Sequence, residues 1–97
     1  MTTIDVRCHR VGDGWRCEAA VDDGRTSGLH AVTIPDPDAA RLAPTLDQAG
    51  VERLVEATFA FLLEREPRSS ILASFDPAVV RRYFPEYDAE VARRLST

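Results

Sequence analysis

The sequence predicts an α+β fold: a three-stranded antiparallel β-meander at the N-terminus, covered on one face by a long amphipathic helix and followed by two or three short C-terminal helices. Three observations indicate this class. Residues 4–34 alternate apolar and polar side chains, as half-buried strands do, and two turn signals, VGDG and DDG, interrupt them. Residues 46–66 repeat apolar side chains at helical spacing. Prolines divide residues 69–95 into short segments that also have helical spacing.

Length and composition predict a single domain that covers residues 1–97. A chain of 97 residues can bury one modest core, and 44% hydrophobic with 29% charged residues is typical of a folded globular protein. The net charge of −4 repels nucleic acid overall. Lysine is absent, which excludes the Walker phosphate-binding motif and Schiff-base chemistry.

The strand register follows from the two turns. A two-residue loop at 23–24 would place Cys17 opposite His30, and a four-residue loop at 11–14 would place Cys8 opposite Cys17. The face expected to be buried then comprises Ile4, Val6, Cys8, Trp15, Cys17, Ala19, Val21, His30, Val32 and Ile34. The opposite face comprises Asp5, Arg7, His9, Arg16, Glu18, Ala20 and Asp22, so the sheet should have one buried side.

The main helix should follow a crossing loop over residues 35–45. Three prolines in this loop forbid a long helix, although one helical turn at 38–43 is compatible with them. Thr45 and Gln48 match a capping box that opens a helix over residues 46–66. Its sheet-facing stripe comprises Val51, Leu54, Val55, Thr58, Phe59 and Leu62. Two apolar side chains, Phe61 and Leu63, fall beside this stripe and need a second partner.

The C-terminal segment, residues 69–95, should pack on the domain as short helices. The stretch ILASF within residues 70–75 fits either a short helix or an edge strand, and we favour the helix. Asp76 is a predicted N-cap with Pro77 at the first helical position, and a last helix is expected over residues 86–95. The inward positions are Val80, Phe84, Tyr87, Val91 and Leu95.

The two cysteines and His30 are the candidates for a metal or redox site. Cys8, Cys17 and His30 would be lateral neighbours on the buried face, as three zinc ligands could be. The usual ligand spacings are absent, so we interpret all three as core residues and expect neither a metal nor another cofactor. The N-terminus has no signal-peptide pattern, which predicts a cytoplasmic protein with free thiols.

Catalytic motifs are not found in the sequence. The serines stand at expected caps and turns, with no nucleophile-elbow pattern around them. Acidic pairs such as Asp36 and Asp38 lie beside prolines, where carboxylates are usually solvated. We therefore expect that the protein is not an enzyme.

Two arginine pairs near the C-terminus form a candidate interaction surface. Arg81, Arg82, Arg93 and Arg94 stand close to Tyr83 and Phe84, an arrangement that suggests a helix-turn-helix with phosphate contacts. Arginines near helix C-termini also complement the helix dipole, and nearby acidic residues nearly cancel their charge. Nucleic-acid binding is therefore not expected.

The hairpin with DGW, the strand that ends in VTIPD and the capped helix resemble the small HicB-type antitoxin domain over about residues 4–66. In that family a Pro-Gly-Cys-like segment follows the strand, whereas PDPDAARLAP stands here. The resemblance implies a dimeric, non-catalytic regulator that binds a toxin, with the C-terminal segment as a DNA-binding remnant.

The leading interpretation is a non-catalytic module that binds another protein or a second copy of itself, with no membrane partner. It rests on a surplus of apolar side chains over what one small sheet can cover. These residues are Phe61, Leu63, Phe75, Tyr83 and Phe84. The HicB-like regulator and the Cys/His metal or redox site are the alternatives.

Overall fold

The computed structural model describes residues 1–96, and these form a mixed four-stranded sheet with four helices, which confirms the predicted α+β class. The strands are β1 (Thr3–Val11), β2 (Gly14–Asp22), β3 (Ser27–Pro35) and β4 (Ser74–Phe75). Their spatial order is β1-β2-β3-β4; the first three are antiparallel, and β4 runs parallel to β3.

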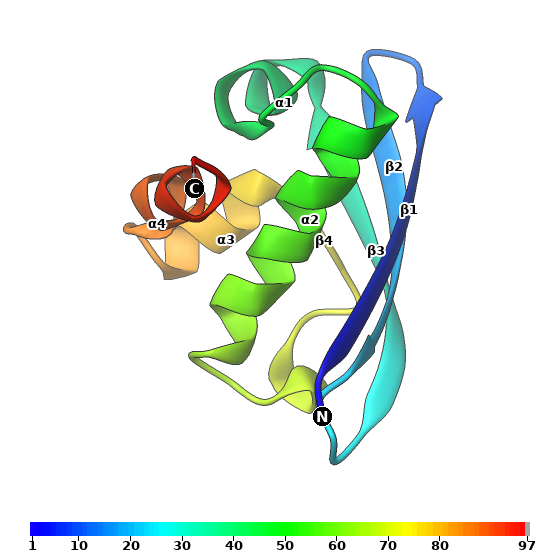
Figure 1. Cartoon of the computed structure of the whole chain (residues 1–97), viewed down its shortest axis with the longest axis vertical. Coiled ribbons are helices and arrows are strands. Elements are labelled where there is room, and N and C mark those ends of the chain that lie inside the picture. The colour runs from blue at the N-terminus through cyan, green and yellow to red at the C-terminus, as the bar shows by residue number, and fades with distance from the viewer. Residues whose placement is uncertain (97) are drawn as a thin grey trace.

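The helices lie on one side of the sheet in two layers (Figure 1). They are α1 (Asp36–Leu42), α2 (Gln48–Leu63), α3 (Pro77–Tyr83) and α4 (Tyr87–Leu95), and a short 3-10 turn, η1 (Arg68–Ser70), precedes β4. Figure 1 shows α2 between the sheet and the C-terminal helices, with α1 at one end of the molecule. The main helix therefore has partners on two sides.

The predicted buried face of the sheet is confirmed. Eight of its ten side chains are buried, and the other two, Ile4 and Trp15, are half-buried at the margins of the core. Arg16, the neighbour of Trp15, is exposed on the outer face. The guanidinium of Arg10 lies 5.1 Å from the centre of the Trp15 ring and binds Asp36 at the start of α1. Arg10 and Trp15 therefore lie at the margin of the core near α1.

The predicted register is right for β1 and β2 and wrong for β2 and β3. Cys8 lies opposite Cys17 as expected. Cys17 lies opposite Val32 instead of His30, and His30 lies opposite Ala19. The connecting loop has four residues instead of two, which shifts the pairing by two positions. Because strand side chains alternate with a period of two, this shift leaves every residue on its predicted face.

The first turn is shorter than predicted. Val11 pairs with Gly14, so only Gly12 and Asp13 form the loop, in place of four residues. Gly12 has a φ of +57°, and no residue other than glycine has a positive φ among residues 1–96. Positive φ at the first central position is typical of the tight II′ hairpin turn, which favours glycine there.

Cys8 and Cys17 form a disulfide, so the prediction of free thiols is wrong. The backbone N–H of Cys8 donates to a carboxylate oxygen of Glu52 at 2.9 Å and therefore points away from β2. The two cysteines are thus a non-hydrogen-bonded cross-strand pair, the kind with the closest Cα atoms, here 4.0 Å apart. The prediction of free thiols rested on a reducing cytoplasm, although the predicted register already placed the two cysteines opposite each other.

The N-cap of α2 is Asp47, not Thr45 as predicted. The Asp47 carboxylate accepts hydrogen bonds from the Thr45 hydroxyl (2.7 Å) and the Gly50 backbone N–H (2.8 Å). These bonds, in that order, lower the pKa of Asp47. The helix covers 48–63, less than the predicted 46–66. A Cβ on Gly50 would lie 2.0 Å from the Thr45 carbonyl oxygen, so this close approach requires glycine.

The favoured helix over residues 70–75 is wrong, and the edge-strand alternative holds for two residues. The Ala31 N–H of β3 donates to the Ala73 carbonyl at 2.8 Å, and β4 follows at once. This pairing covers an otherwise open sheet edge. The predicted cap of α3 is confirmed, because the Asp76 carboxylate accepts a 3.0 Å hydrogen bond from the Val79 N–H.

The C-terminal helices supply the second partner that Phe61 needs. Phe61 and Tyr87 are fully buried with ring centres 5.5 Å apart, and Phe84 packs against Phe61 at 5.8 Å. The Tyr87 hydroxyl lies 2.8 Å from the Thr58 hydroxyl, which itself donates to the Leu54 carbonyl at 2.8 Å. Burial raises the pKa of Tyr87 to about 12. This side of α2 is therefore part of the core.

Replacing Tyr87 with phenylalanine should lower the free energy of unfolding by about 1 kcal/mol, because the buried Thr58 oxygen loses a hydrogen-bond partner. Urea denaturation checks this value. Tyr83→Phe is the matched control and should change stability by less than about 0.5 kcal/mol, since Tyr83 is exposed. Equal losses in the two variants would contradict the role of the buried hydroxyl pair.

Reduction of the Cys8–Cys17 disulfide should lower the free energy of unfolding by about 2–3 kcal/mol, as expected for a loop of roughly ten residues. Denaturation with and without a reductant measures this difference. The double variant Cys8→Ala, Cys17→Ala should not respond to reductant. Alkylation of both thiols in unreduced, unfolded protein would show that the bond does not form.

Candidate binding groove

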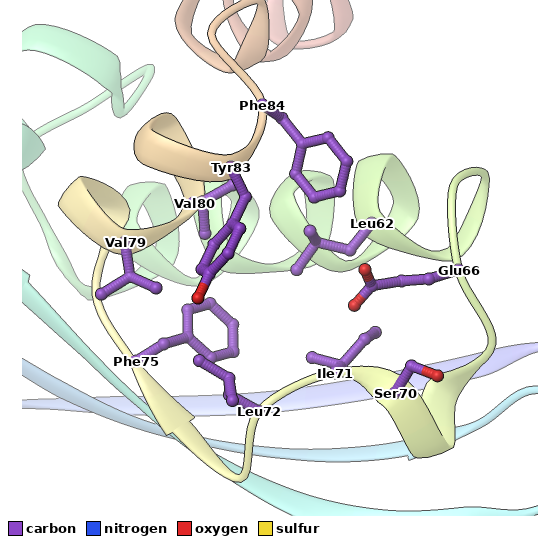
Figure 2. Close-up of a pocket in the computed structure, with 10 residues that line it drawn as sticks. All are labelled: Leu62, Glu66, Ser70, Ile71, Leu72, Phe75, Val79, Val80, Tyr83 and Phe84. Atoms are coloured by element: carbon purple, nitrogen blue, oxygen red, sulfur yellow. The ribbon is translucent and has the colours of Figure 1, made fainter.

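A groove of about 290 Å³ lies between the C-terminal end of α2, the segment that leads into β4, and α3 (Figure 2). Most of its side chains are apolar. The lining residues are Leu62, Glu66, Ser70, Ile71, Leu72, Phe75, Val79, Val80, Tyr83 and Phe84. Its volume is at the lower limit of ordinary ligand pockets, so it can receive one large side chain or a small molecule.

The inner wall of the groove is part of the hydrophobic core and is therefore firmly placed. Ile71, Phe75 and Val80 are each buried. The Phe75 ring packs edge-on against Phe59 of α2, with ring centres 5.7 Å apart. The Asp76 cap fixes the start of α3 directly after this wall. Contacts within the core and the cap of α3 thus hold the inner wall in place.

The outer rim of the groove carries two exposed hydrophobic side chains. Tyr83 of α3 is 69% exposed, and Leu72, just before β4, is 51% exposed. Figure 2 shows both at the same side of the groove, with the Phe75 ring between them in this view. The rim therefore continues the apolar lining out to the molecular surface.

Of residues 1–96, Glu66 is the one charged residue that lines the groove. Burial raises the pKa of its carboxyl group. Among residues 1–96, no side chain forms an ion pair with it, although its neighbour Arg65 binds Glu86 at 3.2 Å. Ser70, on η1, is the other polar side chain at this end of the lining besides Glu66 (Figure 2). An occupant of the groove would thus meet a carboxyl group at one end.

Two hydrogen bonds tie the floor of the groove to β3. His30 Nδ1 lies 2.8 Å from the Leu72 carbonyl oxygen and donates to it, and Ala73 accepts the backbone bond from Ala31. The His30 ring is buried 5.2 Å from the Phe59 ring, and its Nε2 has no hydrogen-bond partner within the described chain. The sequence candidate His30 therefore positions Leu72 in this structure.

The Asp23 carboxylate is a second anchor, which holds η1, the segment that leads into the floor of the groove. The Asp23 carboxylate accepts backbone hydrogen bonds from Arg25 and Thr26 in its own loop (2.9 Å each) and from Arg68 of η1 (3.1 Å). These bonds lower the pKa of Asp23 to about 2. A Cβ on Gly28 would lie 2.3 Å from the Arg68 guanidinium, so glycine lets Arg68 cross the strand.

Three of the four arginines predicted as an interaction surface are engaged in ion pairs within the fold. Arg81 binds Asp38 and Asp88, Arg93 binds Glu90, and Arg94 binds Glu64. Arg82 is exposed and forms no ion pair within residues 1–96. Most of the positive charge that a phosphate contact would use is thus paired with carboxylates of the same chain.

The other candidates fall in different places. Tyr83 and Phe84 line the groove, Leu63 is half-buried against the core, and Phe61 lies within the core. The cysteines are joined to each other, and no three His, Cys, Asp or Glu side chains of residues 1–96 are placed to hold a metal ion. Sequence reasoning missed Glu66 as a site residue, because its role depends on the turn that follows α2.

The Asp23 anchor predicts a specific pH dependence. Because the pKa of Asp23 is lowered, its carboxylate stabilises the fold above about pH 4, and this contribution disappears as the pH falls through about 2. The difference in thermal stability between the wild type and Asp23→Asn should therefore be largest near pH 7 and shrink below pH 4. Asp5→Asn, an exposed carboxylate on the outer face, is the control. A gap that stays constant down to pH 2 would contradict this anchor.

Comparison with known proteins adds no relative to this picture. Within residues 1–96, no helix is both long enough and apolar enough to cross a membrane. No protein-family model, curated protein or solved structure matches the chain. Function is therefore inferred from the groove and the surface around it.

Proposed function

We propose that this chain is a non-catalytic binding module whose groove receives an apolar group of a protein partner or of a second copy of the chain. One observation carries the proposal: an apolar groove with a fixed inner wall opens beside two exposed large hydrophobic side chains, Leu72 and Tyr83. Contiguous apolar surface of this kind is typical of interaction sites.

The chemistry of the lining favours binding over catalysis. Acid–base catalysis uses positioned groups with complementary protonation states, and the groove supplies one carboxyl group, Glu66. The Ser70 hydroxyl has no histidine, lysine or second carboxyl group beside it in the lining. Aromatic and aliphatic side chains around one polar group are instead what a recognition pocket needs.

The two alternatives from the sequence have less support. Phosphate contacts by Arg81, Arg93 and Arg94 would compete with the ion pairs that these residues already form. A thiolate metal site would require cleavage of the Cys8–Cys17 bond. The toxin-binding regulator implied by the HicB resemblance stays a prediction about the partner.

The cytoplasmic location also stays a prediction. Disulfides persist mainly in oxidising compartments, so the Cys8–Cys17 bond is an argument against it. Rapid alkylation of the protein in intact cells tests the location indirectly. Mostly reduced cysteines would favour the cytoplasm, and a mostly intact bond would favour an oxidising compartment.

A neutral apolar dye such as Nile red should bind the groove of the wild-type protein at about 1 μM, with increased fluorescence. Leu72→Glu should weaken this binding about tenfold, because it removes an apolar contact and adds a charge at the rim. Leu29→Glu is the matched control, since Leu29 is 79% exposed on the outer face of the sheet, away from the groove. Equal affinity in both variants, or no dye binding to the wild type, would contradict the proposal.

A further inference from the structure

We propose that the groove is occupied by the same face of a second copy of this chain, in a two-fold symmetric dimer. Tyr83 of each copy enters the groove of the other, and Arg82 of each copy pairs with Glu66 of the other. This inference rests on the proposed binding function of the groove and names its occupant. Its support comes from an exposed anchor, from two residues of opposite charge that form no ion pair within residues 1–96, and from the placement of Tyr83 and Glu66 around the groove.

Tyr83 has the properties of an interface anchor. It is the exposed aromatic residue on the rim, and it stands next to a groove large enough for one such ring. Tyrosine is enriched among residues that dominate binding energies, because it buries a large apolar ring and keeps its hydroxyl hydrogen-bonded. In the proposed dimer the ring leaves water, while its hydroxyl can reach the polar end of the other groove at Ser70.

Two residues of opposite charge, Glu66 in the groove lining and the exposed Arg82 next to Tyr83, are available to pair between copies. Glu66 forms no ion pair within residues 1–96, and neither does Arg82, which directly precedes Tyr83. The arginines closest to Glu66 in sequence are engaged elsewhere: Arg65 binds Glu86, and Arg68 donates to the Thr26 hydroxyl at 3.1 Å. A second copy would therefore supply the cation that Glu66 lacks in its own chain.

The placement of these residues suits a two-fold axis. Figure 2 shows Tyr83 and Glu66 at opposite ends of the groove, on α3 and on the turn after α2. A two-fold axis through the middle of the groove exchanges its ends, so the Tyr83 end of one copy meets the Glu66 end of the other. Each contact then occurs twice, as in any isologous interface.

The dimer should be weak. The groove and its rim form a small patch, and interfaces that bury less than about 1,200 Å² in total are typical of transient complexes. We therefore expect a dissociation constant in the range of about 10–100 μM. At about 1 μM, where the dye experiment is performed, the chain would be monomeric and its groove open.

Sedimentation equilibrium of four proteins from about 1 μM to about 1 mM tests the dimer. They are the wild type, Glu66→Arg, Arg82→Glu and the double charge swap. Each single reversal should raise the dissociation constant about tenfold or more, because the lost pair and the new repulsion both occur twice. The double swap should return the constant to within about threefold of the wild-type value.

Two further variants serve as controls. Tyr83→Ala should weaken the dimer by about tenfold or more without disturbing the fold, because the side chain is exposed. Arg93→Glu reverses a charge whose partner, Glu90, lies in the same helix, and should leave association unchanged. Circular dichroism and thermal unfolding check that each variant is folded. If a charge variant does not fold, the dissociation constant of Tyr83→Ala decides whether the dimer uses the groove.

The outcomes separate the dimer from the general binding function. A wild type that stays monomeric at about 1 mM overturns the dimer; if it still binds Nile red at the groove, a different protein or a small apolar molecule becomes the occupant. A monomer that binds no dye overturns both proposals. A dimer that the single reversals do not weaken, or that the charge swap does not restore, overturns the Arg82–Glu66 pairing and with it this arrangement.

Discussion

The structure depends on burying both sides of α2. On the sheet side, Phe59 contacts the rings of His30 and Phe75, and on the other side Phe61 contacts Phe84 and Tyr87. A helix with apolar side chains around most of its circumference needs partners on more than one face. The sheet covers one face of α2 and the C-terminal helices cover the other. The chain after α2 therefore completes the hydrophobic core.

The groove is a consequence of this layered arrangement. α2 ends at Leu63, and the chain then turns back through η1 to reach the edge of the sheet at β4. From there α3 returns toward α2, and the space between the two helices is filled only in part, by Phe75 and Val80. The site therefore forms where two layers separate, while its floor is held by the His30 ring, which donates to Leu72, and by the Asp23 carboxylate, which accepts from Arg68.

The sequence predicted the faces of the sheet well but not its loops or pairing partners. Alternation identifies which side chains are buried, but it cannot detect a register error of two residues. His30 was predicted opposite Cys17 and lies opposite Ala19. The two-residue strand β4 is defined by its contact with β3 and has no local pattern of its own. Of the site residues, Tyr83 could be predicted from the sequence as a surplus aromatic side chain. Glu66 could not, because its place in the groove depends on the path of the turn after α2.

The Glu52 carboxylate that accepts the Cys8 N–H also bears on how this molecule avoids unwanted assembly. β1 is a nine-residue strand at the margin of the sheet, and such margins are templates for adding foreign strands. An intruding chain would have to displace a carboxylate already bound to the central amide of this margin and then place its own backbone carbonyl beside that negative charge. The bond to Glu52 therefore opposes the addition of a further strand near the middle of β1.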